Sequence, residues 1–385
     1  MTALIDFTDE IYTSIENNHP FISVFIDFQK AFDRLNHSIL LHKLSFFGFT
    51  DNTIKFFENY LSNRTQKTLI NNKLSDPLTI THGVPQGSNL GPLLFLLYIN
   101  DINLSINNSK IIQFADDTTL YTSHNNIETL KYNIQNDLIK INNWCESNNM
   151  ALNSKKTKIM TFGRKKMVKN TKTIEIEINN TKLQMVNNYR YLGMTLDECL
   201  NYNNYIKKIL SSVAHKMYLM KRVKQYLTEK SCLLIYKSFI LPIIEYGNVL
   251  YRNTNKSNLC KLQRIQNHCI KVCLNLDPRS DTKVIHEKAK LNFLEDRREK
   301  QILKLMFERT KEDIYLEKPN EEQRQTRSMS APKLKFPKFK NNQAKKAVIY
   351  EGSILWNNLP NIIKKSETKK LFNSRIDSHF KKKLR

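Results

Sequence analysis

Residues 111–121, IIQFADDTTLY, place two acids, Asp116 and Asp117, between two short runs of β-branched and aromatic residues. This pattern predicts a β-hairpin with both carboxylates at its turn. Residues 21–28, FISVFIDF, predict a buried strand with a third acid, Asp27, near its end. Three carboxylates on adjacent strand ends repel one another unless a cation neutralises them. The pattern therefore predicts a site for two divalent ions roughly 4 Å apart, the arrangement used in phosphoryl transfer.

The rest of the chain predicts an α+β protein in which helices predominate. Eight Gly and ten Pro in 385 residues are few for an all-β protein with many tight turns. Hydrophobic periodicity changes from mixed helix and strand patterns to almost purely helical patterns near residue 200. The predicted strands are 65–71, 78–82, 152–162, 173–178, 182–186 and 189–196, and the predicted helices are 31–47, 51–62, 90–102, 126–148, 205–226, 229–251, 255–274 and 293–309, with a last helical unit around Trp356.

Charge is divided unevenly along the chain. Residues 1–150 carry 10 basic and 15 acidic side chains, whereas residues 151–385 carry 51 basic and 21 acidic ones. A positive field over the later part attracts polyanions, above all a phosphate backbone, and an anionic membrane surface is the weaker alternative. No stretch approaches the ~20 apolar residues of a membrane span, so we expect no membrane partner and a cytoplasmic and nuclear location.

Six scattered cysteines show no disulfide framework and are expected to be reduced thiols. Cys260, His268, Cys269 and Cys273 lie close in sequence, within a helical pattern of apolar residues. Structural zinc sites usually have paired Cys-x2-4-Cys knuckles. The pattern favours packing within a helix, and a zinc site is the alternative.

Five segments of the chain resemble a known family. They are FIDFQKAFD at 25–33, GVPQGSNLGPLLF at 83–95, FADD at 114–117, LNSKKTKIM at 152–160 and YLGMTLD at 191–197. In this order they resemble the successive palm motifs of reverse transcriptases. KAFDRLNHSILLHKL, LLFLLYINDI and ILWNNLP at 354–360 resemble the jockey-like group of non-LTR retrotransposons.

This resemblance implies an α+β right-hand polymerase, with an antiparallel palm sheet and packed helices, followed by an all-α basic thumb and a C-terminal region. The implied domains are a palm over 1–200, a helical thumb or connection over 201–309, a basic linker over 310–345 and a C-terminal helical tail over 346–385. Most of the fingers and the N-terminal endonuclease of the group are expected to be missing, which favours a truncated element or a partial gene.

The resemblance also assigns roles to individual residues. Asp27 and Asp116 would be the main metal ligands and Asp117 a supporting acid, while Lys156 would stand near the pyrophosphate, with Lys155 and Lys158 as rivals. Phe32 would block a ribose 2′-hydroxyl. The expected nucleotide-binding residues are Phe28, Phe32, Gln86 and Gly87, and the expected primer-grip residues are Tyr191, Leu192 and Gly193.

The implied activity is RNA-directed DNA polymerisation with two Mg²⁺ ions, or Mn²⁺ in their place. The implied partners are an RNA template, a DNA primer and deoxynucleoside triphosphates, in a ribonucleoprotein with element RNA. Two alternatives remain open. One is an inactive, truncated relic that only binds RNA, and the other is a group II intron maturase, which would have a different thumb and a His-Asn nuclease tail.

Overall fold

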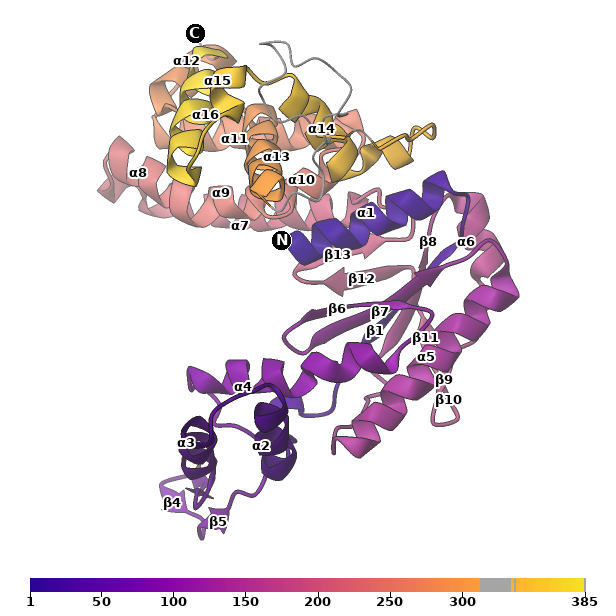
Figure 1. Ribbon diagram of the computed structural model, residues 1–385. Helices are drawn as coiled ribbons and strands as arrows, with labels where there is room; N and C mark the ends of the chain where they lie inside the picture. The colour runs from indigo at the N-terminus through magenta and orange to yellow at the C-terminus, as the bar shows by residue number, and fades with distance from the viewer. Residues whose placement is uncertain (312–333, 336, 384–385) are drawn as a thin grey trace. The chain divides into compact units, whose positions relative to one another are not determined.

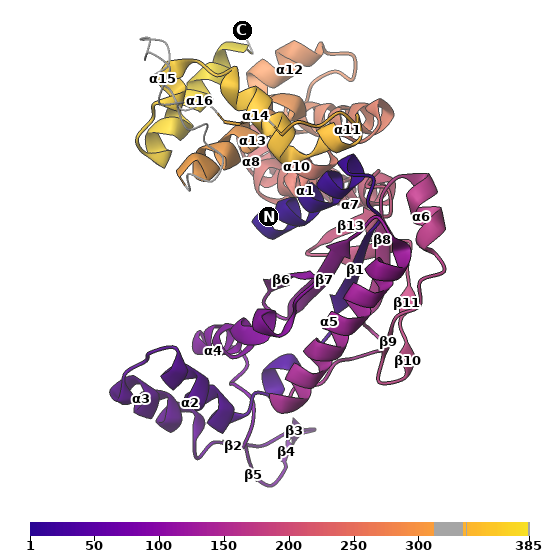
Figure 2. The same ribbon diagram turned by 45° about the vertical axis from the view of Figure 1, so that its right-hand side comes forward.

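The computed structural model describes residues 1–311, 334–335 and 337–383 (Figures 1 and 2). The chain is α+β, as predicted. It divides into two compact units, each of which is described separately. The sheet unit is Asn18–Asn187, and the helical unit combines Met1–Asn17 with Asn188–Arg385.

A five-stranded sheet forms the centre of the sheet unit, with the order β11-β8-β1-β7-β6. All neighbours in it are antiparallel except β11 and β8, which are parallel. Every residue of the central strand β1 is buried, which explains its unbroken apolar run. The strands are β1 (Phe21–Ile26), β6 (Lys110–Phe114), β7 (Asp117–Ser123), β8 (Lys158–Phe162) and β11 (Gln184–Met185).

Helices and short hairpins complete the sheet unit. The long helix α5 carries a stripe of buried residues that includes Leu130, Ile134, Leu138 and Ile141, which join one core with β1. The helices are α2 (His37–Phe46), α3 (Asp51–Leu61), α4 (Leu90–Ile99), α5 (Ile127–Ser147) and α6 (Lys165–Thr171), with 3₁₀ turns at Ala31–Asp33 and Asn100–Ser105. The two-residue strands are β2 (Thr65–Gln66), β3 (Leu69–Ile70), β4 (Lys73–Leu74), β5 (Leu78–Thr79), β9 (Glu177–Ile178) and β10 (Thr181–Lys182).

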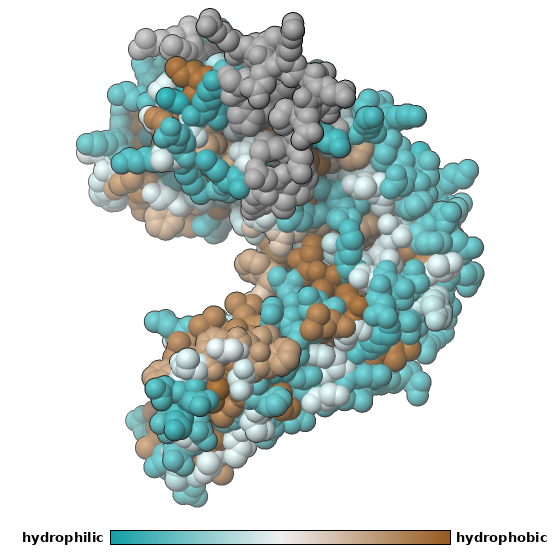
Figure 3. Space-filling view, viewed as in Figure 1, coloured by the Kyte–Doolittle hydropathy of each residue, from teal (hydrophilic) through white to brown (hydrophobic). Residues whose placement is uncertain are grey.

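Apolar side chains reach the surface of the sheet unit at several places, two of which lie on α4 and on the β2–β5 segment. Leu93 and Leu96 of α4 are exposed, and Figure 3 shows a brown patch over this helix. Leu69, Leu74 and Leu78 of the β2–β5 segment are also exposed. These strands bury none of their side chains, which is why the predicted strands 65–71 and 78–82 shorten to pairs of residues.

The helical unit is built from helices and one hairpin. Its aromatic centre is Trp356, whose ring centroid lies 5.8 Å from that of Phe372, with Phe307 stacked on Phe372 at 4.4 Å. The hairpin consists of β12 (Asn188–Tyr191) and β13 (Met194–Asp197). The helices are α1 (Thr2–Glu16), α7 (Asn203–Val223), α8 (Glu229–Ile235), α9 (Leu241–Glu245), α10 (Asn248–Tyr251), α11 (Lys256–Cys273), α12 (Thr282–Ala289), α13 (Leu294–Lys311), α14 (Val348–Asn357), α15 (Asn361–Lys364) and α16 (Lys369–Lys383), with 3₁₀ turns at Lys224–Tyr226 and Ala344–Lys346 and a π-helical turn at Tyr236–Ile240.

Helix α1 is tied to the end of the chain within this unit. The carboxylate of Asp9 accepts hydrogen bonds from the N–H groups of Val348 and Ile349 at 2.7 and 3.2 Å, and so caps the start of α14. Arg309 of α13 pairs with both Asp6 and Asp9. These contacts join residues 300 or more positions apart in the sequence.

Several predicted elements differ from those observed. The predicted helix 229–251 is divided into α8, a π-turn, α9 and α10, because Pro242 lacks an N–H and Gly247 adopts a φ of 70°. The predicted helix 31–47 begins later, since the side chain of Asn36 caps α2 by accepting from the Ile39 N–H at 3.1 Å. The predicted strand 152–162 is a strand only from Lys158 onwards.

The predicted boundary at residue 200 separates a palm from a thumb, whereas the observed division near residue 187 separates two compact units. The limits of the palm and the thumb therefore stay a prediction. Most of the predicted basic linker, residues 312–333 and 336, lies outside the described residues. Leu334 is buried, and its backbone exchanges two hydrogen bonds with the side chain of Asn357. Among the described residues, none of the helices combines the length and apolar character required to cross a bilayer.

Candidate active site

The pairing of β1 with β7 brings two of the predicted acids opposite each other. Ile26 pairs with Thr118, so the next position outward on each strand is Asp27 and Asp117. Phe114 pairs with Asp117 across the hairpin, which leaves Ala115 and Asp116 as the two residues of its loop. Ala115 adopts a φ of 54°, as two-residue hairpin loops of this kind require. Asp27, Asp116 and Asp117 therefore meet at one end of the sheet.

The carboxylates of this end repel one another. Burial raises the pKa of Asp117 above its usual value, and the negative charges of Asp116 and Asp27 raise it further. The Oδ2 atom of Asp27 is buried and has no hydrogen-bond partner among the residues that the structure describes. A buried carboxylate oxygen without a partner is costly, and a cation beside it would remove that cost.

The donor set suits magnesium. Within the described ranges no group of three His, Cys, Asp or Glu side chains is arranged to hold an ion by itself. Mg²⁺ does not need such a cage, because it commonly binds through one or two carboxylates and completes its shell with water and substrate phosphates. The unpartnered oxygen of Asp27, together with the adjacent Asp116 and Asp117, fits that mode of binding.

The segment that carries Lys156 is fastened directly to Asp27. The backbone N–H of Asp27 donates to Thr157 Oγ1 at 3.2 Å, and the Asn153 N–H donates to the Asp27 carbonyl at 2.8 Å. Residues 153–157 form a turn in which the Lys156 N–H donates to the Asn153 carbonyl at 3.1 Å. The predicted strand therefore starts late because this turn precedes it.

The three candidate lysines of this segment differ in their contacts. Lys158 Nζ donates to the Lys155 carbonyl at 2.6 Å and to Gln184 Oε1 at 2.8 Å. Lys155 and Lys156 are exposed, and neither side chain makes a hydrogen bond or ion pair within the described part of the chain. Lys158 is thus held by the edge strand β11 and by the preceding turn, whereas Lys155 and Lys156 are available to a substrate.

Phe28 and Phe32 have different surroundings. Phe28, next to Asp27, is buried and forms a bridge with Leu152. Phe32 lies in the 3₁₀ turn Ala31–Asp33, is half-buried, and packs on Phe95 of α4 with ring centroids 4.7 Å apart. Contact with a nucleotide is therefore expected of the partly exposed Phe32 rather than of the buried Phe28.

The glycine-rich loop before α4 packs along the residues that follow Asp27. The N–H groups of Gly83 and Val84 donate to the carbonyls of Leu35 and Phe32 at 2.7 and 3.0 Å. Gln86 Nε2 donates to Asp33 Oδ1 at 2.9 Å. The structure thus brings Gln86 close to Asp33 and the turn that holds Phe32.

The predicted primer-grip residues lie in the helical unit, at the tip of the β12–β13 hairpin. Leu192 and Gly193 form a two-residue loop with φ values of 44° and 83°. Tyr191 is buried and packs edge-on against Phe7, with ring centroids 5.4 Å apart. The Tyr246 hydroxyl donates a hydrogen bond to the Leu192 carbonyl.

Cysteine packing follows the prediction of a helix interior. Cys269 and Cys273 of α11 are fully buried, whereas Cys260 of the same helix is exposed. These thiols therefore do not share one face on which a zinc ion could be held.

Comparison with known proteins identifies the domain. The family of reverse transcriptases (RNA-dependent DNA polymerases) matches residues 8–196. The chain contains a reverse transcriptase domain. This domain includes the whole acidic end of the sheet, the glycine-rich loop and the β12–β13 hairpin up to Leu196.

The relatives of this reverse transcriptase domain are enzymes of mobile elements. The chain is 28% identical over 263 residues to the RNA-directed DNA polymerase from mobile element jockey of Drosophila melanogaster, covering 66% of this chain and 28% of that protein. It is 27% identical over 300 residues to the probable RNA-directed DNA polymerase from transposon BS of the same species, covering 75% and 33%. The chain thus spans about a third or less of the length of these relatives.

A solved structure also shows a weak similarity. Telomerase from Candida tropicalis, determined with a fragment of telomeric RNA, aligns with a TM-score of 0.39 and 12% identity, over 75% of this chain and 52% of that one. A similarity this weak does not constrain the function of the reverse transcriptase domain.

Some contacts of the reverse transcriptase site were not predicted from sequence. They are the hydrogen bonds of Thr157 and Asn153 to Asp27, of Asp33 to Gln86, and of Tyr246 to Leu192. Asp33 closes the quoted motif FIDFQKAFD, and Asn153 lies inside LNSKKTKIM, so their positions within motifs were a usable signal. Tyr246 lies 54 residues from its partner and has no such signal.

Proposed function

We propose that this chain copies RNA into DNA by nucleotidyl transfer at the acidic end of the sheet. The primer 3′-hydroxyl oxygen forms a bond to the α-phosphorus of a deoxynucleoside triphosphate, and the bond from that phosphorus to pyrophosphate breaks. Asp27 and Asp116 would hold two Mg²⁺ ions, with Asp117 in support. When bound, such ions lower the pKa of the attacking hydroxyl and stabilise the leaving oxygen.

The observation that carries the proposal is the unpartnered Oδ2 atom of Asp27, in a setting where Asp116 and Asp27 both raise the pKa of Asp117. Perturbed carboxylates of this kind are typical of functional sites. Family membership supports the same chemistry, because residues 8–196 match reverse transcriptases.

We propose the remaining roles from the motifs that these residues occupy in the reverse transcriptase domain. Lys156 donates to or stabilises the leaving pyrophosphate, since it is exposed on a turn bonded to Asp27. Phe32 excludes a ribose 2′-hydroxyl by its bulk. Gln86 and Gly87 lie beside the nucleotide and template, while Tyr191, Leu192 and Gly193 support the primer end. The partners are an RNA template, a DNA primer and deoxynucleotides, in a ribonucleoprotein of cytoplasm and nucleus.

Primer extension on an RNA template tests the proposal. The purified chain should extend a labelled DNA primer with Mg²⁺ and deoxynucleotides, and Asp116→Asn should lower the rate at least ~10³-fold. Asp76→Asn is the matched control, since Asp76 is an exposed acid between β4 and β5. Full activity in Asp116→Asn would exclude this site assignment.

A second candidate is a protein that binds RNA without copying it. The basic, acid-free helices α7 and α11 favour this alternative, because phosphate contacts by Lys and Arg need no catalytic site. If the wild-type chain binds RNA but gives no extension with Mg²⁺ or Mn²⁺, this alternative replaces the polymerase proposal.

A further inference from the structure

Two neighbouring helices of the helical unit carry many basic residues and no acidic ones. Helix α7 contains Lys207, Lys208, Lys216, Lys221 and Arg222, and α11 contains Lys256, Lys261, Arg264 and Lys271. Neither helix contains an Asp or a Glu. Exposed basic helices in proteins usually carry interspersed acids that balance their charge, so two adjacent acid-free helices indicate an anionic partner.

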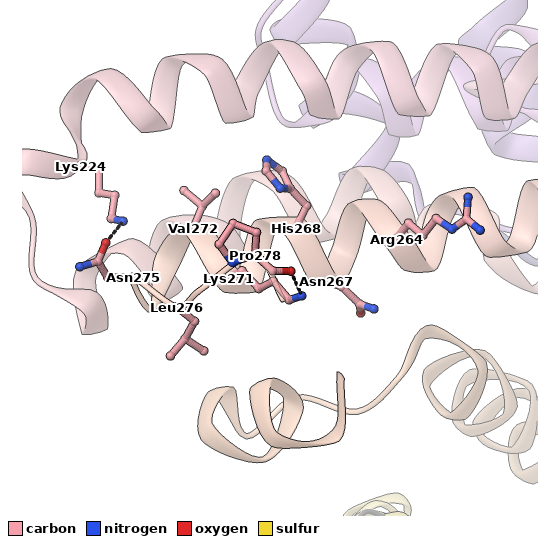
Figure 4. Close-up of a pocket in the computed structure, with 9 residues that line it drawn as sticks. All are labelled: Lys224, Arg264, Asn267, His268, Lys271, Val272, Asn275, Leu276 and Pro278. Atoms are coloured by element: carbon pink, nitrogen blue, oxygen red, sulfur yellow. Dashed lines mark hydrogen bonds between the residues drawn. The ribbon is translucent and has the colours of Figure 1, made fainter. Parts of the chain in front are cut away.

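A cavity of about 440 Å³ lies where α7 ends beside α11 (Figure 4). Four of the nine residues that line it are cations or a histidine: Lys224, Arg264, His268 and Lys271. None of the nine is acidic. A volume of this order is within the range of small-molecule sites, and it suits a group the size of one nucleotide better than an extended chain.

Among the residues that the structure describes, no acidic side chain pairs with Lys224, Arg264 or Lys271. Lys224 Nζ donates to Asn275 Oδ1 at 2.9 Å, and Lys271 Nζ donates to the Pro278 carbonyl at 2.6 Å, so both meet uncharged acceptors (Figure 4). Arg264 is exposed, and its guanidinium has no hydrogen-bond or ion-pair partner among the described residues. Burial lowers the pKa of His268, and the neighbours that lower it further, Lys221 and Lys271, are both cations.

Hydrogen bonds between α11 and α12 hold one wall of the cavity in place. Asn267, which lines it, accepts with Oδ1 from Gln263 Nε2 at 2.8 Å, and the same oxygen lies 2.9 Å from His286 Nε2. The other ring nitrogen of the buried His286, Nδ1, contacts the Leu291 carbonyl at 2.8 Å. This network fixes α11 against α12, so the cationic lining is pre-organised for a ligand.

Two exposed tyrosines lie in α7 and in the 3₁₀ turn that follows it. Tyr226 is 80% exposed and lies two residues after Lys224, and Tyr218 of α7 is 60% exposed. Basic grooves combined with exposed aromatic rings are typical of proteins that bind single-stranded nucleic acid, since unpaired bases stack on such rings. A duplex keeps its bases stacked inside and would not use them.

We propose that this cavity binds a backbone phosphate of single-stranded nucleic acid, with Lys224 and Arg264 as its principal contacts and Tyr226 stacking on an adjacent base. The site lies wholly in the helical unit and uses none of the residues assigned to catalysis. Its failure and the failure of the polymerase proposal are therefore distinguishable.

Fluorescence anisotropy with a labelled, unstructured 12-nucleotide RNA tests the site. We expect the double variant Lys224→Ala/Arg264→Ala to bind at least ~10-fold more weakly, and the slope of its salt dependence to fall by roughly 0.7, the value for one phosphate contact on a single strand. The control Lys256→Ala/Lys261→Ala removes the same charge from α11 outside the cavity and should change affinity less than ~2-fold. Arg264→Ala alone removes a side chain without a partner in the described chain, so a loss of affinity there would not reflect unfolding.

Further arms distinguish the source of the phosphate. An RNA–DNA duplex of the same length should lose less affinity than the single strand in the double variant, and Tyr226→Ala should weaken only single-strand binding. Equal losses in the cavity and control variants would overturn the proposal in favour of diffuse attraction. Tight binding of ATP or of a poly-glutamate peptide to the cavity, or a larger loss for the duplex, would overturn it in favour of another ligand. Asp116→Asn should retain RNA binding throughout.

Discussion

At the scale of single residues, Gly83 shows how closely the glycine-rich loop approaches its neighbours. It adopts a φ of 82°, and a Cβ there would lie 2.8 Å from the Asp33 Cα. We expect Gly83→Ala to lower the free energy of unfolding by about 2–4 kcal/mol, from left-handed strain and a clash with backbone that cannot move freely. Urea denaturation measures the change.

Gly87 provides the matched control for Gly83. Its φ is 83°, but a Cβ would meet nothing within 4 Å. Gly87→Ala should therefore cost only the left-handed strain, about 1–2 kcal/mol. Equal costs at the two positions would show that the contact with Asp33 does not restrain the loop.

The lysines near Asp27 give a second comparison of single residues. Lys156→Ala should slow nucleotide incorporation by about 10²-fold at saturating nucleotide, because an exposed ammonium there assists the leaving group. Lys158→Ala should reduce the rate much less, since Lys158 Nζ is bonded to the Lys155 carbonyl and Gln184. Single-turnover primer extension measures both rates, and the opposite order would assign the role to Lys158.

Sequence reasoning placed the acids of the candidate site at strand ends, as observed, but did not find the residues that hydrogen-bond to them. Asp27 and Asp117 were predictable because a strand period and a hairpin signal fix which residues lie at strand ends. The hydrogen bond from Asp27 to Thr157 depends on a turn at 153–157. The strand pattern of the residues after this turn led to the prediction of a strand over the whole of 152–162. Such contacts arise from tertiary packing, which local patterns do not encode.

At the scale of elements, Tyr246 connects the β12–β13 hairpin to the helices behind it. Its hydroxyl donates to the Leu192 carbonyl, and its own carbonyl accepts from the Tyr205 hydroxyl at 2.9 Å. A Cβ added at Gly193 would lie 3.2 Å from the Tyr246 ring, so the hairpin tip rests on that ring. Tyr246 is thus a positioning residue for the proposed primer grip.

Removing this hydrogen bond should loosen the hairpin tip without unfolding it. We expect Tyr246→Phe to raise the KM for primer–template about 3–10-fold, the equivalent of one hydrogen bond, and to leave kcat for one nucleotide nearly unchanged. The control Tyr218→Phe removes a hydroxyl from an exposed ring of α7. A fall in kcat with unchanged KM would contradict a role in holding the primer.

The burial of Asp9 makes the stability of the helical unit sensitive to pH. Burial raises the pKa of Asp9 to about 7, although Arg309 and the Val348 N–H oppose the rise. Between its ordinary pKa of 3.8 and about 7, Asp9 binds more protons folded than unfolded. Its contribution to stability is therefore present below the lower value and is lost as pH rises towards 7.

Replacing Asp9 should flatten this dependence. Asp9→Asn should remove a decline of up to about 4 kcal/mol in unfolding free energy between pH 4 and 7, while keeping an acceptor for the Val348 N–H. Urea denaturation at several pH values measures the slope. Asp76→Asn, at an exposed position, serves as the control, and an unchanged slope in Asp9→Asn would show that another group titrates.

Elements differed in how well local patterns predicted them. Helix α5 matches its prediction because its stripe of buried residues is long and unbroken. The single helix predicted over 229–251 is interrupted at Pro242 and Gly247. The prediction followed the apolar pattern of this segment and gave too little weight to the helix-breaking effects of these two residues. The capping of α14 by α1 was not predictable at all, since nothing in a local window relates residues 9 and 348.

At the scale of the whole molecule, the acidic side chains proposed to bind metal and the basic side chains proposed to bind RNA lie in different units. The acids that would hold metal belong to the sheet unit, while α7 and α11 of the helical unit hold nine Lys and Arg and no acid. Composition alone predicted this division, because 51 of the 61 basic residues follow residue 150. Metal binding and RNA binding should therefore be separable in solution.

Chelation and salt should abolish different properties of the same protein. Excess EDTA should stop primer extension while RNA affinity changes less than ~2-fold, because phosphate contacts by Lys and Arg need no metal. Raising salt from 50 to 200 mM should instead weaken RNA binding, by at least ~10³-fold if six or more phosphates are contacted. Extension on a template supplied far above its weakened Kd should still proceed at high salt, since the carboxylates bind metal at short range and are screened less. If EDTA released the RNA as well, metal ions would have to bridge the protein and the nucleic acid, and the two tasks would not be divided between the units.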